Sequence, residues 1–176
     1  MQTLNTRQVY ENPWMRLRED KILRADGSEG IYAVVDKPTY ALIIPLDGER
    51  LHVVEQFRYP LGLRRWEFPQ GTAPGMADTD PLELAARELR EETGLRAGQM
   101  VELGLLDVAA GMSSQRGRVY LATELTEGPH EREHEEQDMR TAWIERKEFE
   151  AMIQRQEVTD AQSIAAYAML LMRERQ

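Results

Sequence analysis

Hydrophobic and polar positions along the chain predict strands in the first half and helices mainly in the second. The unbroken apolar run from Ala41 to Leu46 is typical of a strand that is buried on both faces. Asp47-Gly48 supplies hairpin turn chemistry, and 51–57 is expected to return as the neighbouring strand. Further strands are expected at 14–23, 31–35, 100–110, 118–125 and 140–144.

Three helices are predicted, at 81–93, 147–154 and 161–173. The first has clear boundaries, because Asp80 and Glu83 form a capping box around Pro81 and Gly94 supplies the left-handed stop. Strands and helices intermixed in this order predict an α/β chain of the α+β type, with helices packed on a mixed sheet.

The strands at 14–23 and 31–35 are predicted to pair as a β-hairpin ahead of the main body. A hairpin of this size is marginal unless something covers it. We therefore expect an N-terminal extension over residues 1–38, covered by the main domain (39–176) or by a second subunit.

Composition adds limits on function. The 176 residues hold 22 Lys+Arg and 31 Asp+Glu, for a net charge of −9. This acidic balance argues against binding to nucleic acid or anionic lipid through bulk charge, so a phosphate ligand would need a local device such as bound cations. Zero cysteines exclude disulfides, thiolate zinc sites and thiol nucleophiles. With no apolar run of spanning length and no apolar signal core, we expect a soluble, cytoplasmic protein.

The predicted helix 81–93 has an expected buried stripe of Leu82, Ala85, Ala86 and Leu89. Its other side gathers three carboxylates: Glu88, Glu91 and Glu92. Glu88 and Glu92 lie one turn apart, where like charges repel by about 0.2–0.5 kcal/mol. Two interpretations are open. The carboxylates form a solvated face with i,i+4 pairs to Arg87, or a hard divalent cation binds them.

Residues 87–95 read Arg-Glu-Leu-Arg-Glu-Glu-Thr-Gly-Leu, and Gly71 precedes them. Together they resemble the signature of the Nudix hydrolases, Gly-x5-Glu-x7-Arg-Glu-U-x-Glu-Glu-x-Gly-U, in which U is apolar. The second half matches at every specified position. In the first half, Thr79 replaces the family's first glutamate, eight positions after Gly71 instead of six, and Asp78 or Asp80 is the candidate substitute.

The segments 55–60 (Glu-Gln-Phe-Arg-Tyr-Pro) and 66–71 (Trp-Glu-Phe-Pro-Gln-Gly) extend the resemblance. They are similar to the ADP-ribose pyrophosphatase and nucleoside diphosphate sugar hydrolase branch. Residues 68–71 are also similar to the dinucleoside polyphosphate and RNA pyrophosphohydrolase branch. The resemblance implies a Nudix-type mixed β-sheet sandwiched between helices, with the leading β segment exchanged across a homodimer.

The resemblance also implies the chemistry. It points to Mg²⁺-dependent hydrolysis, with Mn²⁺ able to substitute, of the pyrophosphate bond in ADP-ribose or a nucleotide sugar by metal-activated water. Glu88 and Glu92 are the implied metal ligands, Glu91 is a third or water-mediated one, and the backbone carbonyl of Gln70 completes the shell. Glu91 and Glu92 therefore belong to the catalytic set as well.

Arg87 is implied to orient these carboxylates by charge-assisted hydrogen bonds. A surface ion pair with Glu83 is the alternative. The general base is expected in the acidic loop 130–138, where Glu135 fits the resemblance best and Glu136 is next. A solvated acidic loop is the competing interpretation.

Three residues are candidates for substrate contact: Arg58, Trp66 and Arg116. The guanidinium of Arg58 matches phosphate geometry, but an exposed ion pair would explain it equally well. Trp66 could stack on an adenine or belong to the core. Arg116 either touches phosphate or balances nearby acids.

Two other functions remain open at this stage. One is a dinucleoside polyphosphate or nucleoside triphosphate pyrophosphohydrolase, and the other is a Nudix-like module that senses nucleotides without hydrolysing them. Such modules tend to lose the carboxylates. Since Glu88, Glu91 and Glu92 are all present here, an enzyme is favoured. The expected partners are a nucleotide-type small molecule and a second copy of the chain, with no stable nucleic-acid partner and no membrane.

Overall fold

The computed structural model describes residues 1–73, 75, 79–132 and 137–175. Its strands are β1 (Gln2–Asn12), β2 (Met15–Leu23), β3 (Glu29–Asp36), β4 (Tyr40–Asp47), β5 (Arg50–Arg58), β6 (Leu63–Glu67), β7 (Gln70–Thr72), β8 (Arg96–Asp107), β9 (Arg116–Thr126) and β10 (Arg140–Glu145). Its helices are α1 (Pro81–Thr93), α2 (Arg146–Gln154), α3 (Ala161–Arg173) and the short 3-10 turn η1 (Tyr59–Leu61). The predicted helices and the predicted strands are confirmed, with boundaries shifted by a few residues.

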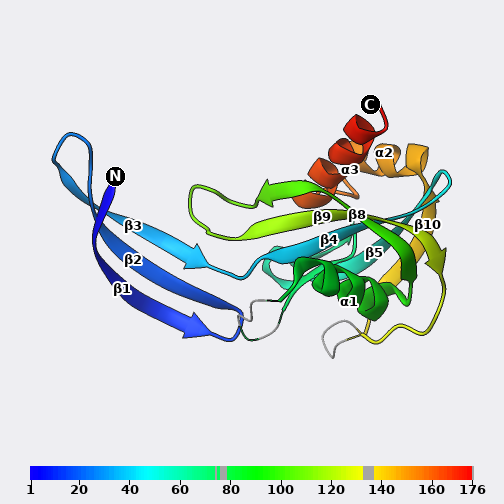
Figure 1. Cartoon of the computed structure of the whole chain (residues 1–176), viewed down its shortest axis with the longest axis horizontal. Coiled ribbons are helices and arrows are strands. Elements are labelled where there is room, and N and C mark those ends of the chain that lie inside the picture. Colours follow the sequence, from blue (N-terminus) through cyan, green and yellow to red (C-terminus); the bar gives the residue numbers. More distant parts are fainter. Residues whose placement is uncertain (74, 76–78, 133–136, 176) are drawn as a thin grey trace.

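The N-terminal segment forms a three-stranded antiparallel sheet in the order β1-β2-β3, which projects from the main body (Figure 1). The predicted hairpin corresponds to β2 and β3. Strand β1 was not expected from the sequence, because its few apolar residues do not alternate regularly with polar ones. Nearly all of its residues are exposed. The hydroxyl of Tyr32 donates to the carbonyl of Gly111 (2.8 Å), and Val35 forms a bridge with Ser113. The β8–β9 connection thus anchors this sheet to the body.

The main sheet has the order β10-β5-β4-β9-β8. Strands β4 and β9 run parallel, and the other paired neighbours are antiparallel. Strand β6 pairs with β5, and β7 pairs with β4. Sequence analysis predicted neither short strand. Both are too short to show a period, and they carry arginines, a glutamine and glycine in place of apolar residues.

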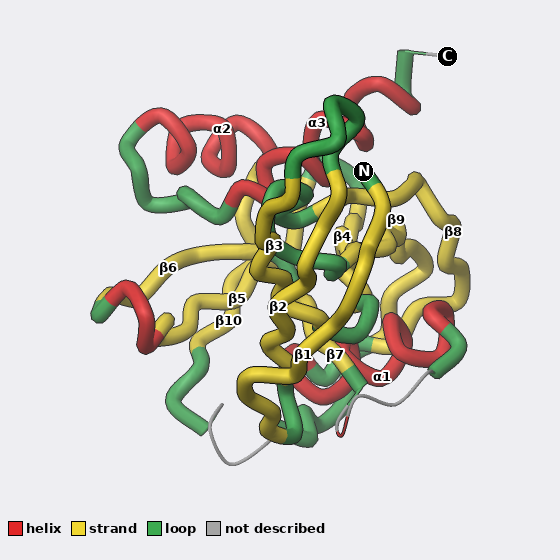
Figure 2. Tube along the Cα trace, turned by 90° about the vertical axis from the view of Figure 1, so that its left-hand side faces the viewer, coloured by secondary structure: helices red, strands yellow, loops and turns green. Residues whose placement is uncertain are grey.

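Helices cover the two faces of this sheet, with α1 on one side and α2 and α3 on the other (Figures 1 and 2). Strand β4 explains this arrangement, because successive side chains of a strand point to opposite faces. Leu42 and Ile44 join the cluster around Phe149 and Leu170. Ala41 and Ile43 join a second cluster with α1. The unbroken apolar run therefore reports a strand with a core on each side, as predicted.

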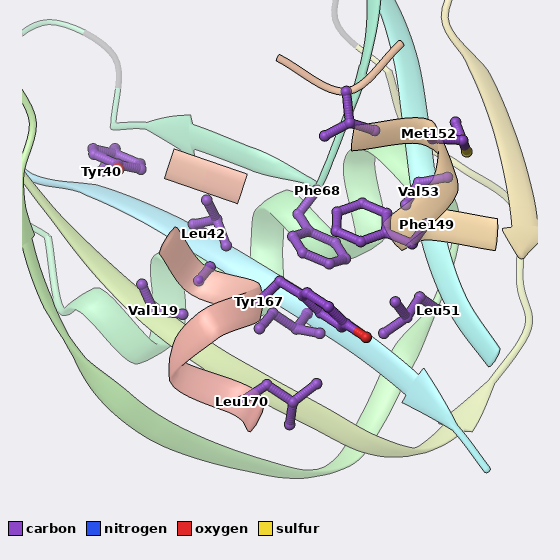
Figure 3. Packing of buried hydrophobic residues seen from close by; sticks show 13 residues of the cluster. Tyr40, Leu42, Leu51, Val53, Phe68, Val119, Phe149, Met152, Tyr167 and Leu170 are labelled. Atoms are coloured by element: carbon purple, nitrogen blue, oxygen red, sulfur yellow. The ribbon is translucent and has the colours of Figure 1, made fainter. Parts of the chain in front are cut away.

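Aromatic rings fill the larger cluster, which Figure 3 shows from close by. Phe68 stacks on Phe149 at a centroid distance of 4.8 Å, and Phe149 meets Tyr167 edge-on at 5.1 Å. Phe68 lies two residues before the start of β7, so this packing anchors the segment that leads into the strand. Among the described residues, no helix is both long and apolar enough to cross a membrane.

Candidate active site

Helix α1 begins and ends where the sequence predicts. The Asp80 carboxylate accepts hydrogen bonds from the backbone N–H groups of Leu82 (2.9 Å) and Glu83 (3.0 Å). Gly94 ends the helix in the left-handed region, with φ 76°. A Cβ at this position would also overlap the carbonyl of Gly128. Two separate requirements therefore favour glycine there.

The buried face of α1 differs from the predicted stripe. Ala85 and Leu89 are buried as expected, but Ala86 is exposed and Leu82 is 46% exposed. The other buried positions on the helix are Leu84, Glu88 and Glu92. Apolar periodicity could not indicate this orientation, because two of the buried residues are carboxylates and pattern analysis assigns such residues to solvent.

Strand β7 accommodates both buried carboxylates. A Cβ at Gly71 would overlap the carboxylate of Glu88, so the absence of a side chain at this position makes room for it. The backbone N–H of Gln70 donates to Oε2 of Glu92 at 3.3 Å. A buried carboxylate is unfavourable unless it is hydrogen-bonded or paired. The carboxylates of helix α1 thus pack against the backbone of strand β7 at Gly71 and Gln70, although the two segments are separate in sequence.

Arg87 lies beside this junction. Its Nη2 is 3.3 Å from Oε1 of Glu88, and its Nε is 3.6 Å from Oε2 of Glu91. These pairs fit the orienting role implied by the family resemblance better than a surface pair with Glu83. Glu91 itself is partly buried. One arginine thus lies between two of the three carboxylates.

The donor set at this junction fits a hard divalent cation. Carboxylate and carbonyl oxygens are the ligands that Mg²⁺ prefers, and Mg²⁺ usually takes one or two carboxylates together with waters and substrate phosphates. Among the described residues, no three carboxylate or histidine side chains converge closely enough to enclose a metal ion. Glu88, Glu92 and the carbonyl of Gln70 are the candidate oxygen ligands at this junction.

A cleft of about 550 Å³ lies beside β7. Its walls come from the β3–β4 connection, the start of β4, the β5–β6 hairpin, β7, the β8–β9 connection and the first turn of α3. Charged and polar residues in its lining include Lys37, Arg58, Arg65, Glu67, Gln70 and Asp160. Glu88 and Glu92 are not among the described residues that line the cleft. Strand β7 connects the two regions, since Gln70 and Gly71 border both the cleft and the carboxylates.

A buried carboxylate, Glu67, holds Arg58 at the cleft. Glu67 is 1% exposed, accepts a hydrogen bond from Nε of Arg58 (3.1 Å) and forms an ion pair with Nη2 of the same guanidinium (2.6 Å). Gln56 donates to the same carboxylate at 2.5 Å. Burial raises the pKa of Glu67 to about 7, although Arg58 opposes this increase, and the nearby Asp160 carboxylate adds to it. The Arg58 side chain remains 38% exposed.

The first turn of α3 fixes the segment that leads into β7. Asp160 caps the helix by accepting from the backbone N–H of Ser163 (2.8 Å), and it also accepts from Nε2 of Gln70 (3.1 Å). The Ser163 hydroxyl in turn accepts from the backbone N–H of Phe68 at 2.9 Å. The capping residues of α3 thus hold both ends of residues 68–70.

Trp66 and Arg116 lie apart from these features. Trp66 is partly buried and packs against the larger core cluster. Arg116 pairs with Asp107 at 3.2 Å, and both side chains are exposed. Neither residue belongs to the described lining of the cleft. The predicted substrate contacts of both residues stay predictions.

The late acidic loop carries the predicted general bases, and Glu135 and Glu136 lie outside the described residues. The flanking residue Arg132 donates to the carbonyls of Glu92 (3.2 Å) and Met139. The backbone N–H of Glu131 donates to the carbonyl of Glu91 at 3.0 Å. The described start of the loop is therefore bound to the end of α1 that carries the carboxylates.

Glu67 and Asp160 were not among the site residues expected from the sequence. A signal existed for Glu67, since it stands between two large aromatic residues, Trp66 and Phe68, and a glutamate is unusual at a core position. Asp160 looks like an ordinary N-cap, and only the folded chain shows that its second role is to bind Gln70.

The fold and this site together define a class of protein in which an acidic helix packs against a glycine-containing strand beside a cation-lined cleft. Residues 36–167 match the model of the NUDIX domain. Residues 1–35 match the nucleoside diphosphate sugar hydrolase N-terminal domain. The chain belongs to the Nudix family.

The chain is also similar to individual proteins. The chain is 35% identical to an ADP-ribose pyrophosphatase of Mycobacterium tuberculosis (strain ATCC 25618 / H37Rv), over 93% of this chain and 80% of the relative. It is 29% identical to a methanol dehydrogenase activator of Bacillus methanolicus, over 70% of this chain and 66% of that protein. A crystal structure of an ADP compounds hydrolase matches the fold with a TM-score of 0.83 at 18% identity, covering 98% of this chain and 92% of that one.

Proposed function

We propose that the protein hydrolyses the pyrophosphate bond of a nucleoside diphosphate linked to another moiety, with ADP-ribose or a nucleotide sugar as the favoured substrate. The observation that carries the proposal is the pair of buried carboxylates, Glu88 and Glu92, held against β7 next to a cleft with three cationic side chains. The M. tuberculosis relative, an ADP-ribose pyrophosphatase, supports this choice of substrate.

Each site residue has a proposed role that depends on where it lies. Glu88, Glu92 and the carbonyl of Gln70 would hold a divalent cation, and Arg87 keeps Glu88 and Glu91 in place. The cation supplies Lewis-acid stabilisation of the charge that develops on the phosphates. Arg58 binds phosphate from the cleft side, where a guanidinium can donate two parallel hydrogen bonds. A carboxylate of the late loop, Glu135 or Glu136, accepts the proton of the attacking water.

Nudix hydrolases generally need a divalent metal. We propose Mg²⁺ as the metal here, with Mn²⁺ as a substitute, because the donor set consists of oxygen atoms. A net charge of −9 makes such a cation more important, since a bare pyrophosphate would be repelled.

The test is product identity. Adding ADP-ribose and Mg²⁺ should release equal amounts of AMP and ribose 5-phosphate, and EDTA should stop the release. The same assay should include nucleotide sugars, dinucleoside polyphosphates and nucleoside triphosphates. A clear preference for either of the last two classes would replace the proposed substrate. Nucleotide binding without any product, at any divalent-ion concentration, would indicate a sensing module.

We propose further that residues 1–38 form a dimerisation extension of the 39–176 Nudix domain, in a cytoplasmic homodimer. The N-terminal sheet exposes several large apolar side chains: Leu4, Val9, Tyr10, Trp14 and Ile31. Exposed apolar side chains gathered on one small sheet are typical of an interaction surface. Sedimentation equilibrium should give twice the chain mass of 20.3 kDa. A mass of one chain at micromolar concentration would contradict the dimer.

A further inference from the structure

The presence of the buried contact between Glu67 and Arg58 is not explained by a contribution to the stability of the fold. A charged carboxylate that is 1% exposed loses most of its hydration, and a buried ion pair often contributes less stability than apolar residues of the same volume. Glu67 nevertheless lies at a core position, opposite the fully buried Val54 on the neighbouring strand. The role of Glu67 is therefore expected to be its effect on the side chains that it binds.

Those groups come from one strand and converge on one carboxylate. Gln56 and Arg58 belong to β5, and both donate to Glu67 at the end of β6. Nε of Arg58 donates a hydrogen bond to Oε2 of Glu67, and Nη2 lies 2.6 Å from Oε1 in an ion pair. A guanidinium has five N–H donors in a rigid plane, so Glu67 does not engage all of them. Because both contacts go to one carboxylate, they fix the plane as well as the position of the Arg58 side chain.

We propose that Glu67 is a positioning residue, which orients the Arg58 guanidinium so that its remaining donors present a preformed site for a substrate phosphate in the cleft. This deepens the proposed function and rests on it. Arg58 fits the role because it lines the cleft and is exposed enough to be reached. Ordering an arginine before binding removes part of the entropy loss that binding would otherwise require.

The first test is Glu67→Gln, which keeps the size of the side chain. The amide offers one acceptor oxygen in place of two and turns donor hydrogens toward groups that are themselves donors, so Arg58 loses its fixed plane. The KM for ADP-ribose should rise about 10-fold while kcat changes less than about threefold, because a charge-assisted hydrogen bond to the substrate is weakened. Arg58→Lys keeps the charge but removes the fork, and should give the same pattern.

The second test is a double-mutant cycle, which separates positioning from a general structural effect. In an Arg58→Lys background, Glu67→Gln should change KM by less than about twofold, because the side chain that it positions has lost its fork. Multiplicative effects of the two substitutions would overturn the proposal. Glu174→Gln is the matched control, since it removes the charge and one acceptor from another arginine–carboxylate contact, with Arg146, away from the cleft. Its KM should equal that of the wild type.

A binding measurement makes the outcome independent of turnover. AMP titrated calorimetrically in EDTA should bind Glu67→Gln about 10-fold more weakly than the wild type, and adenosine should bind both equally. If the wild type hydrolyses none of the substrates tested, the proposed function fails, yet the AMP titration still decides the role of Glu67. Equal AMP affinity in wild type and Glu67→Gln, with the variant fully folded by circular dichroism, would overturn the positioning role.

Discussion

Replacing Glu92 with glutamine should reduce kcat/KM for ADP-ribose by about 10³-fold or more. Glu92 is 1% exposed, and its carboxylate accepts a hydrogen bond from the backbone N–H of Gln70 at the proposed cation site. The amide has almost the same shape but no charge, so it is a far weaker ligand for a hard cation. If the cation is bound less tightly, the charge that develops on the phosphates in the transition state is stabilised less.

Metal titration and thermal unfolding separate this explanation from misfolding. Glu92→Gln should keep the wild-type melting temperature or exceed it in the absence of metal, because the substitution removes a buried negative charge. Its apparent affinity for Mn²⁺ should fall as the activity falls. Glu83→Gln is the control on an exposed position of the same helix and should retain full activity. Undiminished turnover by Glu92→Gln would disprove the site assignment.

Replacing Gly71 with alanine should reduce activity by about 10²-fold, although a single methyl group is added outside the carboxylate set. The new Cβ would overlap the Glu88 carboxylate and displace it from β7. A displacement of about 1 Å in an active site can lower the rate about 10²-fold, and disturbing the support of a metal ligand lowers metal affinity about 10- to 100-fold.

The matched control is Gly111→Ala, because a Cβ at that position meets no atom within 4 Å. It should leave kcat, KM and Mn²⁺ affinity unchanged. The Gly71→Ala variant should regain part of its activity at high Mn²⁺ concentration if its defect is weakened metal binding. Wild-type Mn²⁺ affinity in Gly71→Ala would show that Glu88 does not depend on the space at this glycine.

Local features of the chain were predictable because each depends on neighbours in sequence. The ends of α1 followed from Asp80 and Gly94, whose capping chemistry acts within one turn. The apolar run of β4 predicted a strand with a core on both faces, which the two clusters confirm. The Nudix signature in residues 87–95 identified the family before any fold was visible.

Contacts between distant segments were not predictable in the same way. The charged residues of α1 suggested a solvated face or a site, and only the packing of α1 on β7 buried Glu88 and Glu92. Strand β7 has three residues and no period, so its pairing with β4 depends on the sheet that surrounds it. The sharing of Asp160 between α3 and Gln70 likewise arises only when the two segments meet.

The sequence by itself therefore determined the family, the boundaries of the acidic helix and the residue types that suit phosphate chemistry. It also determined the net charge of −9, which argues against binding a phosphate ligand through bulk charge. The tertiary structure alone decided which carboxylates are buried and which arginine is held at the cleft. The physical reason is that capping and periodicity act over a few residues, whereas burial and ion pairing depend on segments that the chain brings together from far apart.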